Sequence, residues 1–124
     1  MIKIEIPKPD LVLTRNDQYG QTGEEEGSKA YAFAEFMQIP RDKGGIFMFY
    51  NINDELMYVG KARKLRQRIK KHFDDNVSAI KNHRDEVDKI EVCYVEDAVD
   101  REIYETFIIN NLQAKYNVDK VFFR

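Results

Sequence analysis

The stretch that decides the fold covers residues 44–72 and reads GGIFMFYNINDELMYVGKARKLRQRIKKH. It holds two short runs rich in apolar and aromatic residues, 46–50 and 56–59, with the polar segment 51–55 between them. A break rich in Asn and Asp between two β-favouring runs is typical of a hairpin. We therefore expect two antiparallel strands, at about residues 45–51 and 56–60.

A basic amphipathic helix is expected directly after this hairpin. Ala62, Leu65, Ile69, His72 and Phe73 recur at helical spacing and predict one apolar stripe that packs on the sheet. Residues 61–73 also hold seven Lys and Arg and no Asp or Glu. These cations are expected to face outward: Lys61, Arg63, Lys64, Arg66, Arg68, Lys70 and Lys71.

Net charge alone hides this basic segment. The chain totals −2, yet outside residues 61–73 it has 13 basic residues against 22 acidic ones. A compact positive patch on an acidic body is the electrostatic footprint expected for binding a polyanion. A solvated helix face is the alternative. The segment has no acidic residues for i,i+4 pairing, which favours an external negative partner.

Composition limits the class of protein. A chain of 124 residues can form one domain, and 43% hydrophobic residues with 12% aromatics is typical of a folded one. No apolar run approaches the roughly 20 residues that span a bilayer, and Lys3 and Glu5 interrupt the start where an export signal would be apolar. The single cysteine, Cys93, excludes an internal disulfide. We expect a cytoplasmic protein with no membrane association.

The rest of the chain completes an α/β (α+β) pattern. Residues 1–43 are expected to be an N-terminal extension, with a short strand at 2–6, a loop at 16–27 and a helix at about 28–38. Further along, the sequence predicts a helix at 78–86, a third strand at 89–95 and a last helix capped by Asp97 and ending near Gln113. The apolar set of that helix is Val99, Ile103, Phe107, Ile108, Ile109 and Leu112.

The order of a tyrosine, a glycine turn and a basic helix resembles the GIY-YIG nuclease family, in particular the excinuclease type of nuclease domain found in bacteria. Gly45-Ile46-Phe47 stands at the first motif and Tyr58-Val59-Gly60 at the second. The resemblance covers residues 44–118 and leaves 119–124 as a C-terminal tail. It implies a small three-stranded antiparallel sheet flanked by helices. It also implies cleavage of DNA with Mg²⁺ or Mn²⁺.

Glu105 is the candidate metal ligand. Its carboxylate stands at the edge of an apolar stripe, where it costs free energy unless it binds a cation or hydrogen-bond donors. From the residues alone, the favoured explanation is a boundary glutamate paired with Arg101, one turn earlier. The resemblance assigns it the divalent metal, and assigns Asn117, in Lys115-Tyr116-Asn117, a place beside the active site.

Two more catalytic assignments come from the resemblance. The Tyr58 hydroxyl would lie beside the attacking water, and because a phenol titrates near pH 10 it needs help from Lys61 and the metal. Arg68, eight residues after Gly60, would stabilise charge on the scissile phosphate. Without the resemblance, Tyr58 is best explained as a core residue and Arg68 as a solvated cation.

Phe47 departs from the family, because its position usually carries a tyrosine whose hydroxyl helps to hold the water. Losing that hydrogen bond slows cleavage by roughly ten- to a hundredfold without abolishing it. Tyr50 is a poor substitute, since strand alternation points it to the opposite face. His72 is a secondary candidate for a phosphate contact. The residues expected to hold DNA are Arg63, Lys64, Arg66, Lys70, Lys71 and His72.

Three functions fit these residues. The first is a metal-dependent DNA endonuclease. The second is a nucleic-acid-binding module on the same fold, with cleavage weakened by Phe47. The third is a protein-interaction domain that uses the acidic surface. A domain this small would need a partner protein or a homodimer to recognise a specific DNA.

Overall fold

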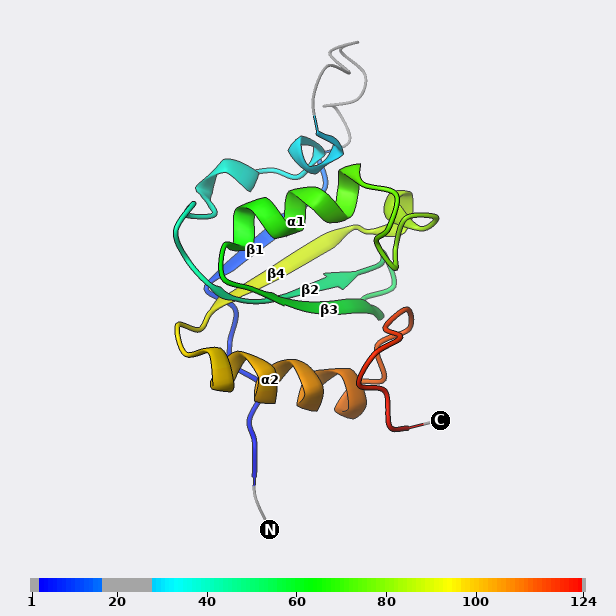
Figure 1. Ribbon diagram of the computed structural model, residues 1–124. Coiled ribbons are helices and arrows are strands. Elements are labelled where there is room, and N and C mark those ends of the chain that lie inside the picture. The colour runs from blue at the N-terminus through cyan, green and yellow to red at the C-terminus, as the bar shows by residue number, and fades with distance from the viewer. Residues whose placement is uncertain (1–2, 17–27, 124) are drawn as a thin grey trace.

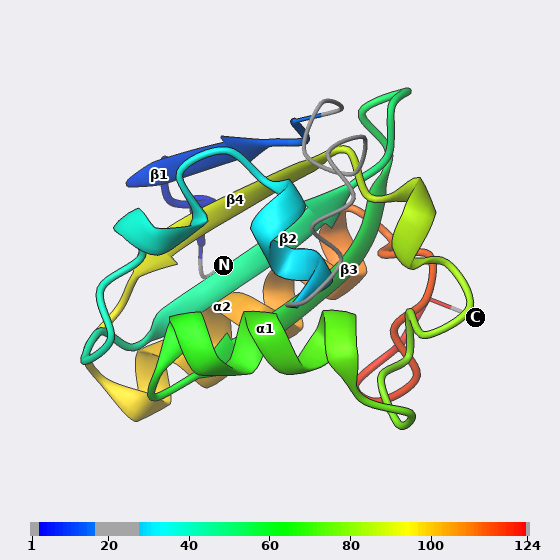
Figure 2. The same cartoon turned by 90° about the horizontal axis from the view of Figure 1, so that it is seen from above.

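The computed structural model describes residues 3–16 and 28–123. A four-stranded antiparallel sheet, in the order β1-β4-β2-β3, separates two α-helices (Figure 1). Helix α1 (Leu65–Asp74) covers one face and α2 (Ala98–Asn111) covers the other. Seen from above in Figure 2, the short 3-10 helix Lys29–Ala32 lies on the same face as α1 and packs against it. No helix in the described part of the chain is long and apolar enough to cross a membrane.

The hairpin is confirmed. Strand β2 (Gly45–Tyr50) pairs with β3 (Leu56–Ala62), and the Asn51 side chain accepts hydrogen bonds from the backbone of Asn53 and Glu55 in the turn between them. An Asn that satisfies its own turn in this way fixes the connection locally. Strand β2 lies at the centre of the sheet between β3 and β4, so all its residues but Tyr50 are buried.

The prediction of a three-stranded sheet is wrong, because β1 (Leu11–Thr14) adds a fourth strand to β4 (Lys89–Tyr94). The expected strand at 2–6 is also wrong in its described part, since residues 3–6 are not in a strand. Pro7 and Pro9 separate that alternating pattern from β1. The outer edge of β4 needs hydrogen-bond partners, and Leu13, fully buried opposite Ile90, supplies the apolar contact there.

Three helix predictions need correction. Instead of one helix at 28–38, the chain forms two 3-10 helices, Lys29–Ala32 and Phe36–Gln38, with Glu35 at a positive φ between them. The helix expected at 78–86 is only the 3-10 turn Arg84–Glu86. Helix α1 begins at Leu65 because β3 continues to Ala62, so Lys61 is a strand residue. Most of the expected loop at 16–27 lies outside the described residues.

Each face of the sheet has its own core. On the α1 side, Leu65, Ile69 and Phe73 pack among the buried aromatic residues of the sheet, as the stripe predicted. On the other side, Ile108 and Ile109 of α2 pack against β2 and β3. The apolar set predicted for α2 is wrong at three positions, since Val99, Ile103 and Leu112 are exposed. The buried positions nearer its start are Arg101 and Glu105.

The chain after α2 covers the free edge of β3. The Lys115 N–H donates to the Leu56 carbonyl at 3.1 Å, and the Tyr116 N–H donates to the Met57 carbonyl at 2.8 Å. An uncovered edge strand would leave these groups unpaired. These hydrogen bonds place Asn117 and the residues after it beside the middle of β3. Residues of α1 and α2, from the two faces of the sheet, meet at this edge.

Candidate active site

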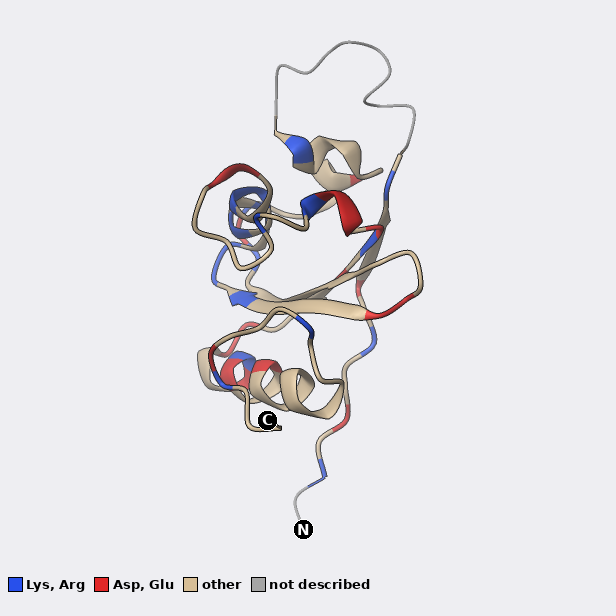
Figure 3. Cartoon of the chain, turned by 90° about the vertical axis from the view of Figure 1, so that its right-hand side faces the viewer, with Lys and Arg blue, Asp and Glu red and all other residues tan. Residues whose placement is uncertain are grey.

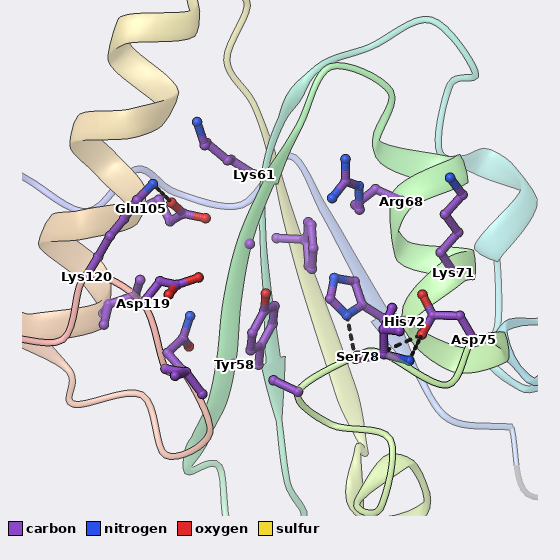
Figure 4. A pocket seen from close by; sticks show the side chains of 17 residues that line it. Tyr58, Lys61, Arg68, Lys71, His72, Asp75, Ser78, Glu105, Asp119 and Lys120 are labelled. Atoms are coloured by element: carbon purple, nitrogen blue, oxygen red, sulfur yellow. Dashed lines mark hydrogen bonds and ion pairs between the residues drawn. The ribbon is translucent and has the colours of Figure 1, made fainter.

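A cleft of about 710 Å³ lies across the edge of β3, at the point where α1, α2 and the chain after Asn117 come together (Figure 4). It collects residues from both faces of the sheet. The sequence-predicted residues that line it are Phe47, Tyr58, Lys61, Arg68, Lys71, His72, Glu105 and Asn117. Positions up to 70 residues apart in sequence therefore share one solvent-accessible site.

Gly60 and Phe47 form the floor of this cleft. A Cβ on Gly60 would stand only 2.2 Å from Phe47 Cζ, so only glycine lets the Phe47 ring lie flat over β3. Phe47 is fully buried, and its ring centroid lies 6.2 Å from that of Tyr58 and 5.3 Å from that of His72. The ring therefore lies near Tyr58 and His72 at the floor of the cleft. Tyr50 packs in the core on the opposite face, as strand alternation predicted.

The Tyr58 hydroxyl is partly buried and points into the cleft (Figure 4). Burial raises the pKa of this phenol above its ordinary value of 10, and the nearby Glu105 and Asp119 carboxylates raise that pKa further. Arg68 and Lys120 lower the same pKa, by smaller amounts than burial. The hydroxyl is therefore protonated at neutral pH and needs added positive charge beside it before it can accept a proton.

Glu105 is buried, with 8% of its surface exposed, and its carboxylate opens onto the cleft. The pairing with Arg101 does not occur, because the Arg101 guanidinium donates instead to the backbone carbonyls of Val95 and Glu96. The cation on Glu105 is Lys120, whose Nζ lies 2.7 Å from Oε1. Lys120 also contacts Glu102, at 2.6 Å.

The donor set around Glu105 fits a divalent cation with few protein ligands. Glu105 is a nearly buried carboxylate that already holds a positive group, and Asp119 directs a second carboxylate into the same cleft (Figure 4). No group of three or more His, Cys, Asp or Glu gathers among the described residues. An ion here would keep most of its water, as Mg²⁺ bound by one or two carboxylates does.

Lys61 is in the cleft, but its ammonium is engaged with Glu102 at 2.6 Å. The cations that act on the Tyr58 pKa are Arg68 and Lys120. The lowering of the Tyr58 pKa that was expected from Lys61 therefore comes from Arg68 and Lys120 in this structure. Lys61 and Lys120 together draw the pKa of Glu102 down to about 2, by their hydrogen bonds to its carboxylate.

Arg68 comes from the second turn of α1 and faces the cleft from the side opposite Glu105 (Figure 4). Within the described chain, its guanidinium has no hydrogen-bond or salt-bridge partner. Five donors held at one wall of an open cleft can bind two oxygens of one phosphate. Lys71 lies one turn further along the same wall.

Some of the basic residues of segment 61–73 line a groove beside the cleft, whereas Arg66 and Lys70 are bound to other parts of the protein. Figure 3 shows Lys and Arg gathered on α1, and a shallow groove next to the cleft is lined by Arg63, Lys64, Gln67, Arg68 and Lys71. Arg66 is different, because its guanidinium donates to the carbonyls of Met37 and Ile39 and thereby ties the N-terminal extension to α1. Lys70 lies 3.9 Å from Asp74, an i,i+4 partner just outside the basic segment 61–73.

His72 is packed rather than exposed on the basic face. Its ring lies 4.9 Å from the Tyr58 centroid, and its Nδ1 is 2.7 Å from the Ser78 hydroxyl. Burial lowers the pKa of the imidazole to about 4. The side chain is therefore neutral at pH 7, so a phosphate contact at this position would come from an uncharged ring N–H rather than from an imidazolium.

The Asn117 side chain forms hydrogen bonds with the backbone of β3. Its Oδ1 accepts from the Val59 N–H at 3.0 Å, and its Nδ2 donates to the Val59 carbonyl at 2.9 Å. The side chain holds the C-terminal segment against the strand that carries Tyr58. The structure thus places Asn117 at the cleft, with its side chain bound to the backbone of β3.

The cleft residues that sequence reasoning missed include two charged ones in the last segment of the chain, Asp119 and Lys120. Both follow Asn117 closely, in the segment expected to be a tail. Lys120 is fixed there by ion pairs, and its carbonyl accepts from Asn110 at 2.8 Å. The available signal was an Asp-Lys pair two residues after the Tyr-Asn motif.

The chain belongs to the GIY-YIG family. The family's catalytic-domain profile matches residues 43–117, which include β2, β3, α1, β4, α2 and the segment that covers β3. Of these elements, β2, β3, α1 and α2 contribute residues to the cleft, as does Asn117. The N-terminal extension up to residue 42 and the residues after Asn117 lie outside the match.

Similar proteins include one of the same length. The chain is 64% identical, over the full length of both, to the uncharacterized protein YurQ of Bacillus subtilis. It is 36% identical over 81 residues to UvrABC system protein C of Pseudothermotoga lettingae, an alignment that covers 60% of this chain and 14% of that protein. The chain therefore spans about a seventh of that relative's length.

A solved structure supports the fold. The N-terminal GIY-YIG endonuclease domain of UvrC from Thermotoga maritima, bound to magnesium as its catalytic divalent cation, aligns with a TM-score of 0.59. The alignment covers 68% of this chain and 98% of that domain, at 23% identity. At this identity the comparison establishes the common fold.

Proposed function

We propose that this protein is a metal-dependent endonuclease that hydrolyses phosphodiester bonds in DNA. The observation that carries the proposal is the cleft itself, which brings Tyr58, Arg68 and Glu105 together from three separate elements. A core tyrosine, a solvated arginine and a boundary glutamate would have no reason to line one cavity. Family membership supports the same reading.

Each residue has a role that follows from its position. The basic groove along α1 holds the sugar-phosphate backbone and directs one phosphate into the cleft. Arg68 binds its non-bridging oxygens and stabilises the charge that builds on them. Tyr58 orients the attacking water, and it would accept the water's proton only as the phenolate, after added positive charge has lowered the pKa of the phenol and its own proton has passed to solvent. Asn117 keeps β3 in place.

Glu105 would hold the divalent cation, with Asp119 close enough to influence it. When bound, such an ion supplies a Lewis acid that draws charge from the phosphate and the leaving oxygen. Magnesium in the Thermotoga maritima UvrC domain supports Mg²⁺, and Mn²⁺ shares its preference for oxygen ligands.

The decisive experiment incubates the full chain with supercoiled plasmid and Mg²⁺ or Mn²⁺. Nicked and linear products should form, and Glu105→Gln should end their formation while DNA binding persists or tightens, because a negative charge has left the cleft. Glu96→Gln is a matched control, since Glu96 lies outside the cleft and is 85% exposed. Equal nicking by Glu105→Gln and the parent would remove Glu105 from the mechanism.

A second candidate is a nucleic-acid-binding module with little or no cleavage. Phe47 favours it, because a fully buried phenylalanine gives the floor of the cleft no hydroxyl. This candidate predicts salt-sensitive DNA binding without nicking by the parent or by Phe47→Tyr, with any divalent metal.

The relatives also suggest a setting. Similarity to UvrABC system protein C favours a cytoplasmic role in DNA repair. Because the chain matches one seventh of that protein, we propose that a partner protein or a second copy supplies specificity for the DNA. Co-purification from cells that express a tagged chain, with and without DNA damage, would test both points.

A further inference from the structure

Four charged side chains form a continuous chain along the α2 side of the cleft. Lys61 contacts Glu102 at 2.6 Å, the other oxygen of Glu102 contacts Lys120 at 2.6 Å, and Lys120 contacts Glu105 at 2.7 Å. Figure 4 shows the Lys120 ammonium at the Glu105 carboxylate, on the side of the cleft where a metal would bind. Two cations and two anions leave the group neutral.

The burial of these groups is unequal. The Glu105 side chain is 10% exposed, whereas Lys120 is 30% and Glu102 44% exposed. An ion pair that includes a nearly buried carboxylate is stronger than one on the open surface, so the Glu105–Lys120 contact is the tightest point of the chain. The Lys120 ammonium contacts Oε1 of Glu105, so a divalent cation bound to either oxygen of this carboxylate would lie close to a like charge. In a partly buried site such repulsion is costly as long as the ammonium stays on Glu105.

We propose that Lys120 is a built-in competitor for the divalent cation: its ammonium occupies Glu105 in the metal-free protein, and the metal binds by displacing it. The proposal rests on the function proposed above, because it assumes that Glu105 is the metal ligand. Glu102 is the second carboxylate that the Lys120 ammonium contacts. It already contacts the same ammonium and keeps it near the cleft after the exchange.

The exchange has a consequence for the site. In the metal-free state Lys120 neutralises Glu105, so the carboxylate is not left buried and unpaired. After displacement, Lys120 remains on Glu102 at the rim of the cleft, opposite Arg68. Lys120 is thus a positioning residue that sets the metal concentration at which the site fills.

Binding of Mn²⁺ to the full chain, followed by the electron paramagnetic resonance signal of the free ion, tests this without any cleavage assay. Lys120→Met should tighten binding by about tenfold, the effect of removing one charge-assisted contact from the ligand. Lys61→Met is the matched control, since it removes an equal charge that touches only Glu102. It should tighten binding by no more than about twofold.

Three outcomes separate the ideas. If both lysine variants tighten binding equally, net charge explains the effect and the competitor is excluded. If Glu105→Gln abolishes binding but Lys120→Met leaves it unchanged, the metal site stands and the competitor fails. If neither the parent nor Lys120→Met binds Mn²⁺, both the competitor and the metal-dependent function fall.

A measurement on the unmodified chain covers the case in which Lys120→Met does not fold. The side-chain ammonium of Lys120, followed by ¹⁵N NMR, should lose its hydrogen bond to Glu105 as Mg²⁺ saturates the site. The Lys61 ammonium should keep its contact with Glu102. An unchanged Lys120 signal at saturating Mg²⁺ would overturn the proposal.

Discussion

Phe47 shows how one side chain couples packing to chemistry. Phe47 of the first motif lies opposite Gly60 of the second motif in the β2–β3 pair, and its ring contacts this glycine. A side chain at position 60 would clash with the ring, so Phe47 requires glycine there. The ring fills the floor of the cleft between Tyr58 and His72. A tyrosine there would keep this packing and extend one hydroxyl past Gly60.

We predict that Phe47→Tyr raises kcat by up to about a hundredfold while DNA affinity stays level, because the added hydroxyl would act only in the transition state. Single-turnover nicking and a separate binding titration measure the two quantities. If the site has no partner for the hydroxyl, stability instead drops by about 1–3 kcal/mol and the rate does not rise. That outcome would remove water orientation as the role of this position.

His72 makes stability depend on pH. Its folded pKa of about 4 lies below its ordinary 6.5, so below pH 6.5 the unfolded chain binds a proton that the folded chain does not. Stability contributed by the neutral ring is complete above pH 6.5 and is lost as the pH falls toward 4.

We expect this single group to cost up to about 3 kcal/mol of unfolding free energy over that interval. Urea unfolding at several pH values, compared between the parent and His72→Gln, measures it. The variant should show a smaller loss between pH 6.5 and 4. Parallel curves for the two proteins would mean that His72 titrates normally in the folded chain.

At the scale of the elements, α1 has two functions on its surface. Its apolar stripe and Arg66 hold the sheet and the N-terminal extension, whereas Arg68 and Lys71 face the cleft and the groove. The basic residues of the segment are therefore not equivalent. A substitution of Arg66 would remove the hydrogen bonds that hold the N-terminal extension on α1, so its main effect would be on stability rather than on DNA binding.

Replacing Arg63, Lys64 and Lys71 together by Gln should flatten the dependence of log affinity on log salt by up to about three units, because each phosphate contact that is lost reduces the number of counterions released on binding. The control replaces Lys3, Lys8 and Lys29, which removes equal charge from residues outside the cleft and the groove. Binding titrations at several salt concentrations give both slopes. Equal slopes for the two triple variants would mean that α1 does not dock DNA.

At the scale of the whole molecule, the site exists because the chain after α2 returns to β3. Glu105 lies on one side of the sheet and Arg68 on the other. They face one cavity at the edge of β3, beside the part of the strand that carries Tyr58, Gly60 and Lys61. The segment 115–117 closes that edge and presents Asp119 and Lys120.

Asn117→Ala tests this closure. The variant leaves the Val59 N–H and carbonyl without the partners they now have, which should cost about 1–3 kcal/mol in unfolding free energy. Because β3 shifts with the segment, kcat should fall while DNA affinity, which depends on α1, changes little. Full stability with a normal rate would show that the contact between Lys115, Tyr116 and β3 suffices.

Local sequence was enough for the elements whose signals are short in range. The hairpin, the stripe of α1 and the Asp97 cap of α2 were all readable from spacing. The family's motif residues were readable too, since they stand at fixed offsets from these elements. Long-range partners were not, as β1, the two 3-10 helices and the ion pair on Glu105 show.

The sequence by itself determined the class of fold, the family and the residues placed at its motifs, because apolar periodicity and turn residues act over a few positions. Only the tertiary structure decided which residues share the cleft and how they are charged. It paired Glu105 with Lys120 rather than with Arg101, tied Arg66 to the extension and buried His72 as a neutral ring. Ion pairs, burial and pKa depend on distances in space, and those arise only when both faces of the sheet and the final segment come together at β3.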